Sequence, residues 1–225
     1  MKTKTLLIAA ATLAVGVIGS QAQVYSANIV GYVNVPLVSG YNLIANPLND
    51  GNGNNISNIL ASANLPNKSQ VITWNGATFN AAIGKINNDN HSWGSYISLS
   101  QGTGFFLKNN GASTTNTFTG SVEPTGYASG ILVSNLLNPG YNLVASVMPL
   151  GGELTTDATL NLSSATLANK SQLISWNTGS QTYNAAVGKI STGTGWGATF
   201  PVTVGQGFFL KSQNSVATNW VQTVQ

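Results

Sequence analysis

The chain of 225 residues contains no cysteine, no arginine and a single histidine. The absence of cysteine excludes disulfide bonds, thiolate metal ligands and thiol nucleophiles. Nucleic-acid binding depends on clustered cations that neutralise phosphates, so the absence of arginine and the scarcity of charge argue against a nucleic-acid partner. Stability must come from a hydrophobic core, which this length can build as one large β domain or two of ordinary size.

Residues 1–22 have the pattern of a secretory signal peptide. A basic start at Lys2 and Lys4 precedes an apolar stretch over residues 6–18, and the small residues Ser20 and Ala22 follow. We predict cleavage after Ala22 and secretion of the mature chain to the cell surface or the extracellular space. The apolar stretch is shorter than the roughly 20 residues of a membrane-spanning helix, and no second one follows, so we predict no membrane insertion.

Cleavage would leave six lysines and five acidic residues, a formal net charge of +1. So little charge argues against binding to an anionic membrane surface. Solubility then depends on neutral polar side chains, among them 28 asparagines. Such a surface provides little repulsion between copies of the protein, which favours self-association.

One phrase occurs twice, as WNGATFNAAIGKI from Trp74 and as WNTGSQTYNAAVGKI from Trp176. Four other segments recur in the same order, at offsets of 100 to 103 residues. They are GYNLIA and GYNLVA (40–45, 140–145), NKSQ (67–70, 169–172), WG (93–94, 196–197) and GFFLK (104–108, 207–211). Shared order with small length differences indicates a duplicated module, and the predicted modules are residues 24–124 and 125–225.

Each predicted module consists of short segments typical of β-strands, rich in β-branched and aromatic residues and bounded by Gly, Asn, Pro or Ser. Only residues 56–63 and 157–165 have a helical pattern. The predicted fold is therefore all-β, with two tandem antiparallel β-sandwich or barrel-like modules. In the first module the predicted strands are residues 28–35, 41–45, 70–74, 96–99 and 104–108.

Residues 75–76, Asn-Gly, predict a hairpin with a type I′ turn, which requires positive φ at both central residues. In the second copy the loop is longer. Trp74 and Trp176 then end a strand, and Phe79 and Tyr183 on the returning strand are their predicted cross-strand partners.

Four segments resemble one family of exported proteins. They are VYSANIVGYVNV (24–35), GYNLIANPLN (40–49), GTGFFLKN (102–109) and the closing ATNWVQTV (217–224). Together they resemble a family of secreted bacterial proteins common in Verrucomicrobia, and the resemblance covers essentially the whole mature chain. It implies secretion and a β fold with two copies of a module. The family has no assigned activity, so the resemblance implies no catalytic residue.

The residues offer no catalytic constellation, so we predict a protein that is not an enzyme and has no cofactor. His91 has only Asp89 near it in sequence, and a catalytic triad also needs a nucleophile. The five acidic residues provide no pair at matching positions in the two copies for glycoside hydrolysis. Residues 84–86 and 102–107 lack the spacing of phosphate and dinucleotide loops.

Residues 50–55 place oxygen atoms at alternate positions, as calcium loops do. Asn55 stands where such loops have glycine, and Ala61 stands where they have a bidentate glutamate. We therefore predict an Asn/Gly turn and no metal site, while calcium binding by this loop stays an open alternative.

Binding or assembly remains as the function. We expect a structural or adhesive protein of the cell surface or extracellular matrix that associates with itself or with other surface proteins, since nearly neutral β modules offer sheet edges for contact. The alternative is a carbohydrate-binding protein whose partner is a neutral polysaccharide. Its rings would stack on sugar faces, whereas packing in a core or at a sheet edge is the explanation that we favour for recurring aromatic residues. The candidate ligand-binding residues are Trp74, Trp93, Trp176 and Trp196.

Overall fold

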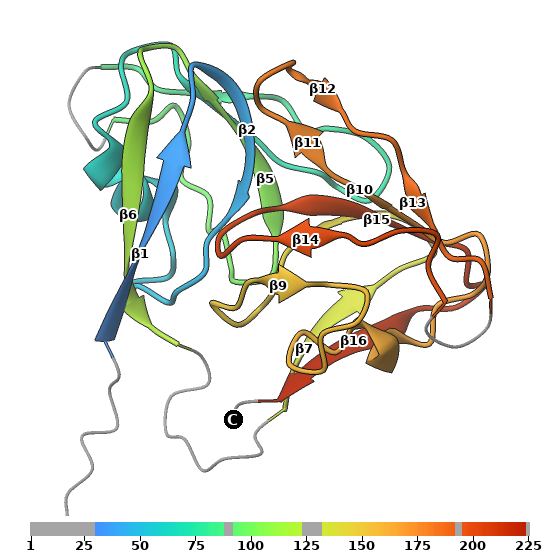
Figure 1. Cartoon of the computed structure of the whole chain (residues 1–225). Coiled ribbons are helices and arrows are strands. Elements are labelled where there is room, and N and C mark those ends of the chain that lie inside the picture. Colours follow the sequence, from blue (N-terminus) through green and yellow to red (C-terminus); the bar gives the residue numbers. More distant parts are fainter. Residues whose placement is uncertain (1–29, 88–91, 123–131, 192–194, 224–225) are drawn as a thin grey trace, which may run out of the picture.

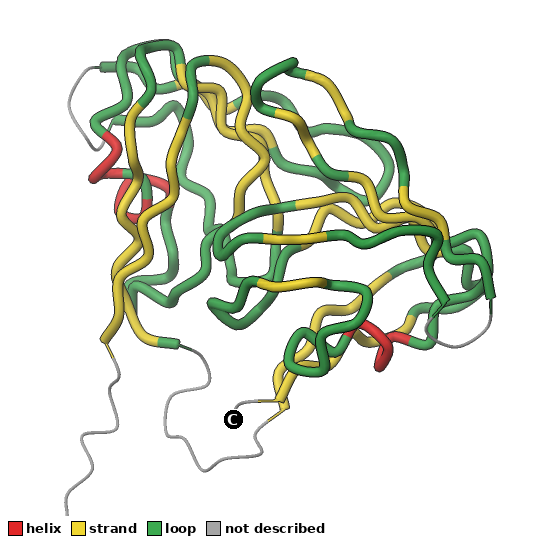
Figure 2. The backbone as a smooth tube through the Cα atoms, viewed as in Figure 1, coloured by secondary structure: helices red, strands yellow, loops and turns green. Residues whose placement is uncertain are grey.

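The computed structural model describes residues 30–87, 92–122, 132–191 and 195–223. The predicted signal peptide, the predicted module boundary and His91 lie outside these residues. Strands and loops make up most of the chain, and the helical segments are short (Figure 2). We call residues 30–122 the first half and residues 132–223 the second half.

The first half contains two antiparallel sheets. β2, β5, β3 and β4 form a four-stranded sheet in that order, and β1 pairs with β6. The elements are β1 (Val30–Leu37), β2 (Gly40–Ala45), α2 (Ile56–Ile59), η1 (Ala61–Ala63), β3 (Gln70–Ile72), β4 (Ile83–Gly84), β5 (Gly104–Asn109) and β6 (Thr114–Ser121).

The second half repeats this arrangement. β8, β15, β10 and β13 form a four-stranded sheet in the same order, β7 pairs with β16, and β9–β14 and β11–β12 are short additional pairs. The elements are β7 (Leu132–Leu137), β8 (Gly140–Val144), β9 (Gly152–Glu153), η2 (Leu162–Ala165), β10 (Gln172–Ile174), β11 (Trp176–Asn177), β12 (Thr182–Tyr183), β13 (Val187–Gly188), β14 (Pro201–Val202), β15 (Phe208–Ser212) and β16 (Thr218–Thr223). The predicted β character is confirmed, and no sheet of the described residues closes into a barrel.

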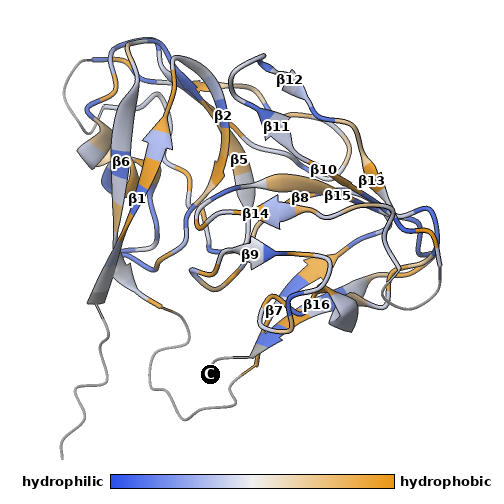
Figure 3. Ribbon diagram, in the orientation of Figure 1, coloured by the Kyte–Doolittle hydropathy of each residue, from blue (hydrophilic) through white to orange (hydrophobic). Residues whose placement is uncertain are grey.

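Each half has its own hydrophobic core. Apolar and polar residues alternate along β1 (Figure 3), so one face of the strand is buried and the other is solvated. Phe105 and Phe118 are buried in the first core, and Phe208 and Trp220 are buried in the second. The indole N–H of Trp220 donates to the carbonyl of Leu160 over 2.6 Å, which satisfies the one polar atom of this buried ring.

A buried amide explains why the GYN segment recurs. The side chain of Asn42 donates to the carbonyls of Val38 and Gly40 and accepts from the Val38 N–H over 2.8 Å. Gly40 has a φ of 89°, a conformation that favours glycine. Asn142 makes the equivalent bonds in the second half. The asparagine therefore holds the turn between the first two strands of each half.

The predicted type I′ turn at residues 75–76 and the predicted helix over residues 157–165 are wrong, because side-chain oxygen atoms accept hydrogen bonds from the backbone amides there. The Asn75 side chain accepts from the amides of Ala77 and Thr78, and only Gly76 of the Asn-Gly pair has positive φ, so the loop is not a type I′ turn. Asp157 accepts from the Thr159 amide and hydroxyl, and within residues 157–165 a helical turn forms only at η2.

Two further predictions concern single segments. Residues 96–99 form no strand, and their backbone makes only an isolated bridge, from Ser98 to Asn55. The expected turn at residues 50–55 is present. The carboxylate of Asp50 accepts from the amides of Asn52 and Asn54 over 2.8 Å, so it closes its own loop.

Candidate functional site

The two four-stranded sheets pack against each other through the faces that point away from their cores. Along β5, Phe105 and Leu107 point into the first core, so the intervening Phe106 points to the opposite face. Phe209 is its counterpart on β15. Phe106 and Phe209 form a third buried cluster together with Leu43 and Leu143. β5 of the first half contacts β8 of the second half at this interface, and Figure 1 shows the two halves packed together.

Backbone hydrogen bonds join the halves reciprocally. The N–H of Ala45 donates to the carbonyl of Gly205 over 2.8 Å, and the N–H of Ala145 donates to the carbonyl of Gly102 over 2.9 Å. Gly102 and Gly205 have φ values of 78° and 77°, and a Cβ on Gly205 would lie 2.6 Å from a methyl group of Val35 in the other half. The glycine that opens each G-x-G-F-F segment is thus required by contact between the halves.

The second glycine of this motif yields a prediction. A Cβ on Gly207 would lie 2.9 Å from the carbonyl oxygen of Ile44 in the other half. Gly207→Ala is therefore expected to lower the free energy of unfolding by about 1–3 kcal/mol through overpacking of the interface. Urea unfolding followed by tryptophan fluorescence measures the change. Gly188→Ala is the matched control, because no atom lies within 4 Å of its Cβ position. Equal stability of the two variants would contradict the close packing of Gly207 against the other half.

The two tryptophan hairpins reach across the interface in the same way. The indole N–H of Trp74 donates to the carbonyl of Tyr141 over 3.0 Å, and that of Trp176 donates to the carbonyl of Tyr41 over 2.9 Å. The longer second loop contributes Gln181, whose side chain accepts from the Tyr41 N–H and donates to the Tyr41 carbonyl. The hairpin of the first half is therefore anchored on β8, and that of the second half is anchored on β2.

Eight aromatic rings meet around these hairpins, and we call them the aromatic cluster. Neighbouring rings lie edge to face, with centroids 5.0–6.5 Å apart and interplanar angles of 68–88°. The predicted cross-strand pairs, Trp74 with Phe79 and Trp176 with Tyr183, are confirmed, each at 5.0 Å. The cluster comprises Tyr41, Trp74, Phe79, Phe106, Tyr141, Trp176, Tyr183 and Phe209.

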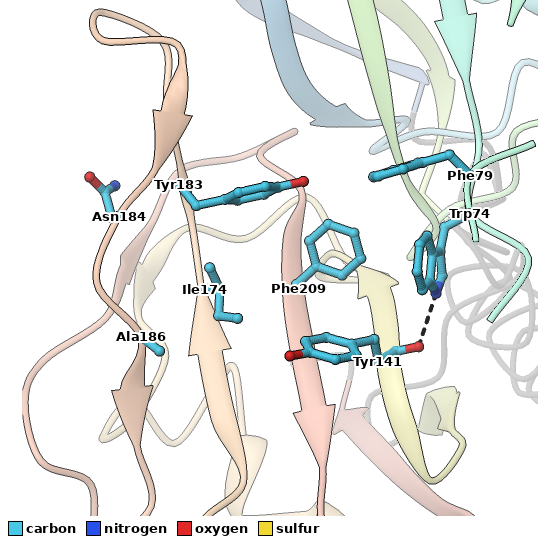
Figure 4. Close-up of a pocket in the computed structure, with 8 residues that line it drawn as sticks. All are labelled: Trp74, Phe79, Tyr141, Ile174, Tyr183, Asn184, Ala186 and Phe209. Atoms are coloured by element: carbon cyan, nitrogen blue, oxygen red, sulfur yellow. Dashed lines mark hydrogen bonds between the residues drawn. The ribbon is translucent and has the colours of Figure 1, made fainter. Parts of the chain in front are cut away.

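Two grooves open on the aromatic cluster, and they are equivalent under the sequence repeat. Phe79 and Tyr183 line both of them. The first groove has a volume of about 400 Å³ and is lined by Trp74, Phe79, Tyr141, Ile174, Tyr183, Asn184, Ala186 and Phe209. The second has a volume of about 290 Å³ and is lined by Tyr41, Ile72, Phe79, Phe106, Trp176 and Tyr183. Figure 4 shows the Phe209 ring between those of Tyr183 and Phe79.

The rings that border both grooves face solvent. Phe79 is 43% exposed and Tyr183 is 45% exposed, while Phe106 and Phe209 form the buried floor. Partial burial raises the pKa of the Tyr183 phenol, as expected for a hydroxyl held against an apolar surface. Among the described residues, no three histidine or acidic side chains gather as metal ligands would. The arrangement is suited to non-covalent binding of a ligand with apolar faces.

The structure brings together two of the four candidate tryptophans. Trp74 and Trp176 belong to the aromatic cluster. Trp93 is 5% exposed in the first core, with the Lys85 ammonium 5.8 Å from its ring centre. Trp196 is half-buried against the second core, with the Lys189 ammonium at 5.4 Å. Burial lowers the pKa of the Lys189 ammonium. Trp93 and Trp196 therefore pack with the cores of their own halves.

Comparison of the chain with protein-family models, with curated proteins and with solved structures finds no match. The resemblance to secreted proteins of Verrucomicrobia therefore stays a prediction. Within the described ranges, no helix has the length and apolar character needed to cross a membrane.

Proposed function

We propose that this chain is an exported, non-catalytic protein that binds carbohydrate on the aromatic surface between its two modules. The observation that carries the proposal is the pair of equivalent grooves, in which solvent-exposed rings from both halves surround an apolar floor. A pyranose offers apolar faces and a rim of hydroxyl groups, so it complements partly exposed rings with neighbouring amides such as that of Asn184.

The proposal includes the origin of the two grooves. A duplicated module would carry the same outward-facing residues twice, and two such faces packed together would form an approximately twofold-symmetric surface. The repeated strand order and the reciprocal indole bonds of Trp74 and Trp176 support this origin. The predicted signal peptide supports export.

The test removes the two rings that both grooves share. Phe79→Ala combined with Tyr183→Ala is expected to weaken retention in affinity gels containing polysaccharide by about tenfold or more, because stacking surface is lost from both grooves. Tyr96→Ala is the control, since Tyr96 is exposed and lines neither groove. Circular dichroism verifies the fold of each variant. Wild-type retention by the double variant would contradict the proposal.

A second candidate function is self-association as a structural or adhesive protein. Three large apolar side chains, Tyr32 on β1 and Leu132 and Leu136 on β7, are exposed on strands that pair on one side only within the described part of the chain. Such strands invite contact between copies. Sedimentation of the mature chain at rising concentration distinguishes the two candidates. Assembly that the aromatic double variant retains would favour this second function.

A further inference from the structure

A tyrosine, a lysine and a glutamine form a row across each four-stranded sheet. Lys108 on β5 lies directly opposite Tyr41 on β2 and Gln70 on β3. In the second sheet, Lys211 lies opposite Tyr141 and Gln172. Residues directly opposite each other across strands share one face of a sheet. The row therefore lies on the same face as Phe106 or Phe209, beside the grooves.

Each lysine lies over a tyrosine that lines a groove. The Lys108 ammonium is 5.5 Å from the ring centre of Tyr41, which lines the second groove. The Lys211 ammonium is 5.1 Å from the ring centre of Tyr141, which lines the first. These ring contacts are the only interactions of the two ammonium groups among the described residues.

The negative charges of the described residues are engaged elsewhere. No carboxylate lines either groove. Asp50, Glu153 and Asp157 each accept hydrogen bonds from backbone amides near them, such as the 2.6 Å bond from the Phe200 N–H to Glu153. Burial acts to raise the pKa of Glu153, but these bonds outweigh it and hold the pKa below its ordinary value. Each groove therefore has an apolar floor and one lysine beside a tyrosine of its wall.

We infer that the ligand is an acidic polysaccharide built from uronate units, a conclusion that rests on the proposed function and replaces the neutral polysaccharide expected from the sequence. The rings contact the apolar sugar faces. The side-chain amides of Gln70 and Gln172 form hydrogen bonds with the sugar hydroxyl groups. Lys108 and Lys211 bind carboxylates through charge-assisted hydrogen bonds. Because Phe79 and Tyr183 line both grooves, a single polysaccharide chain spans the two grooves.

The experiment compares polygalacturonate with its fully methyl-esterified form, which keeps the sugar backbone and removes the charge. We expect the wild-type chain to bind the acid about tenfold tighter than the ester at low salt, and added salt to diminish the difference. Lys108→Gln combined with Lys211→Gln should abolish this preference. Lys68→Gln combined with Lys170→Gln removes the same charge from two exposed loop positions and should leave the preference intact.

Three outcomes would overturn the inference. Equal affinity for the acid and the ester overturns the inference that the ligand is acidic. The proposed function still stands if the Phe79 and Tyr183 double variant no longer binds either polymer. Equal losses in the two lysine double variants show that only overall charge matters. Failure of the wild-type chain to bind polygalacturonate also overturns the inference, and failure to bind any carbohydrate overturns the proposed function with it.

Discussion

Replacement of Phe105 by alanine is expected to lower the free energy of unfolding by about 3–5 kcal/mol. The ring is fully buried in the first core, in one cluster with Leu37 of β1 and Phe118 of β6. Its removal forfeits the transfer free energy of the ring and leaves a cavity, since a closely packed core relaxes only partly around the missing atoms. Urea unfolding monitored by far-ultraviolet circular dichroism measures the loss.

The control for Phe105 is an aromatic residue of the same half that lies on the surface. Tyr32 on β1 is 72% exposed, and Tyr32→Ala is expected to change stability by about 0.5 kcal/mol or less. A loss below about 1 kcal/mol in Phe105→Ala would mean that this residue is not the centre of a packed core.

The sequence is sufficient to predict several of the strands and their local aromatic partners, although residues 96–99, predicted as a strand, form none. The runs at β2, β3 and β5 combine apolar residues with flanking turn residues, and the Trp74–Phe79 pair follows from the hairpin between them. Such features depend on residues close together in the chain. The Asn75 loop was mispredicted because side-chain capping by asparagine and a type I′ turn share the same sequence signal.

The candidate site could be predicted only in part, because its residues are brought together by contact between the halves. The segment GFFLK places Phe105 and Leu107 on one face and Phe106 on the other, so the pattern predicts burial on both faces of β5. It does not identify what covers the second face. The bond from Trp74 to the Tyr141 carbonyl joins residues 67 positions apart, and no local pattern encodes it.

The tryptophan candidates illustrate the same limit. Trp74 and Trp93 both recur near residues typical of strand ends, yet one lies at the interface and the other in a core. The sequence identifies the exposed residues Phe79 and Tyr183 only as hairpin partners, although they line both grooves. A ring that recurs in both copies is predicted to be structurally important, but its environment depends on how the two halves pack.

The rings at the centre of the interface couple the two halves. Phe106→Ala combined with Phe209→Ala is expected to uncouple the unfolding of the two halves. Both rings are buried at the centre of the third cluster, and each contacts rings from the other half, Trp176 for Phe106 and Trp74 for Phe209. Each truncation alone should lower stability by about 3–5 kcal/mol. Because the two residues share one cluster, the combined loss should differ from the sum of the single losses.

Calorimetry and urea unfolding test this uncoupling. We expect the wild-type chain to unfold in one cooperative transition and the double variant in two, each with a smaller m-value because each exposes the surface of a single half. The separate cores around Phe105 and Phe208 remain intact in the variant, so its secondary structure should be retained. The Phe105→Ala variant is the contrasting control, since it weakens one core and leaves the rings of the interface in place. A single transition of undiminished m-value in the double variant would show that the halves are held together by something other than the aromatic cluster.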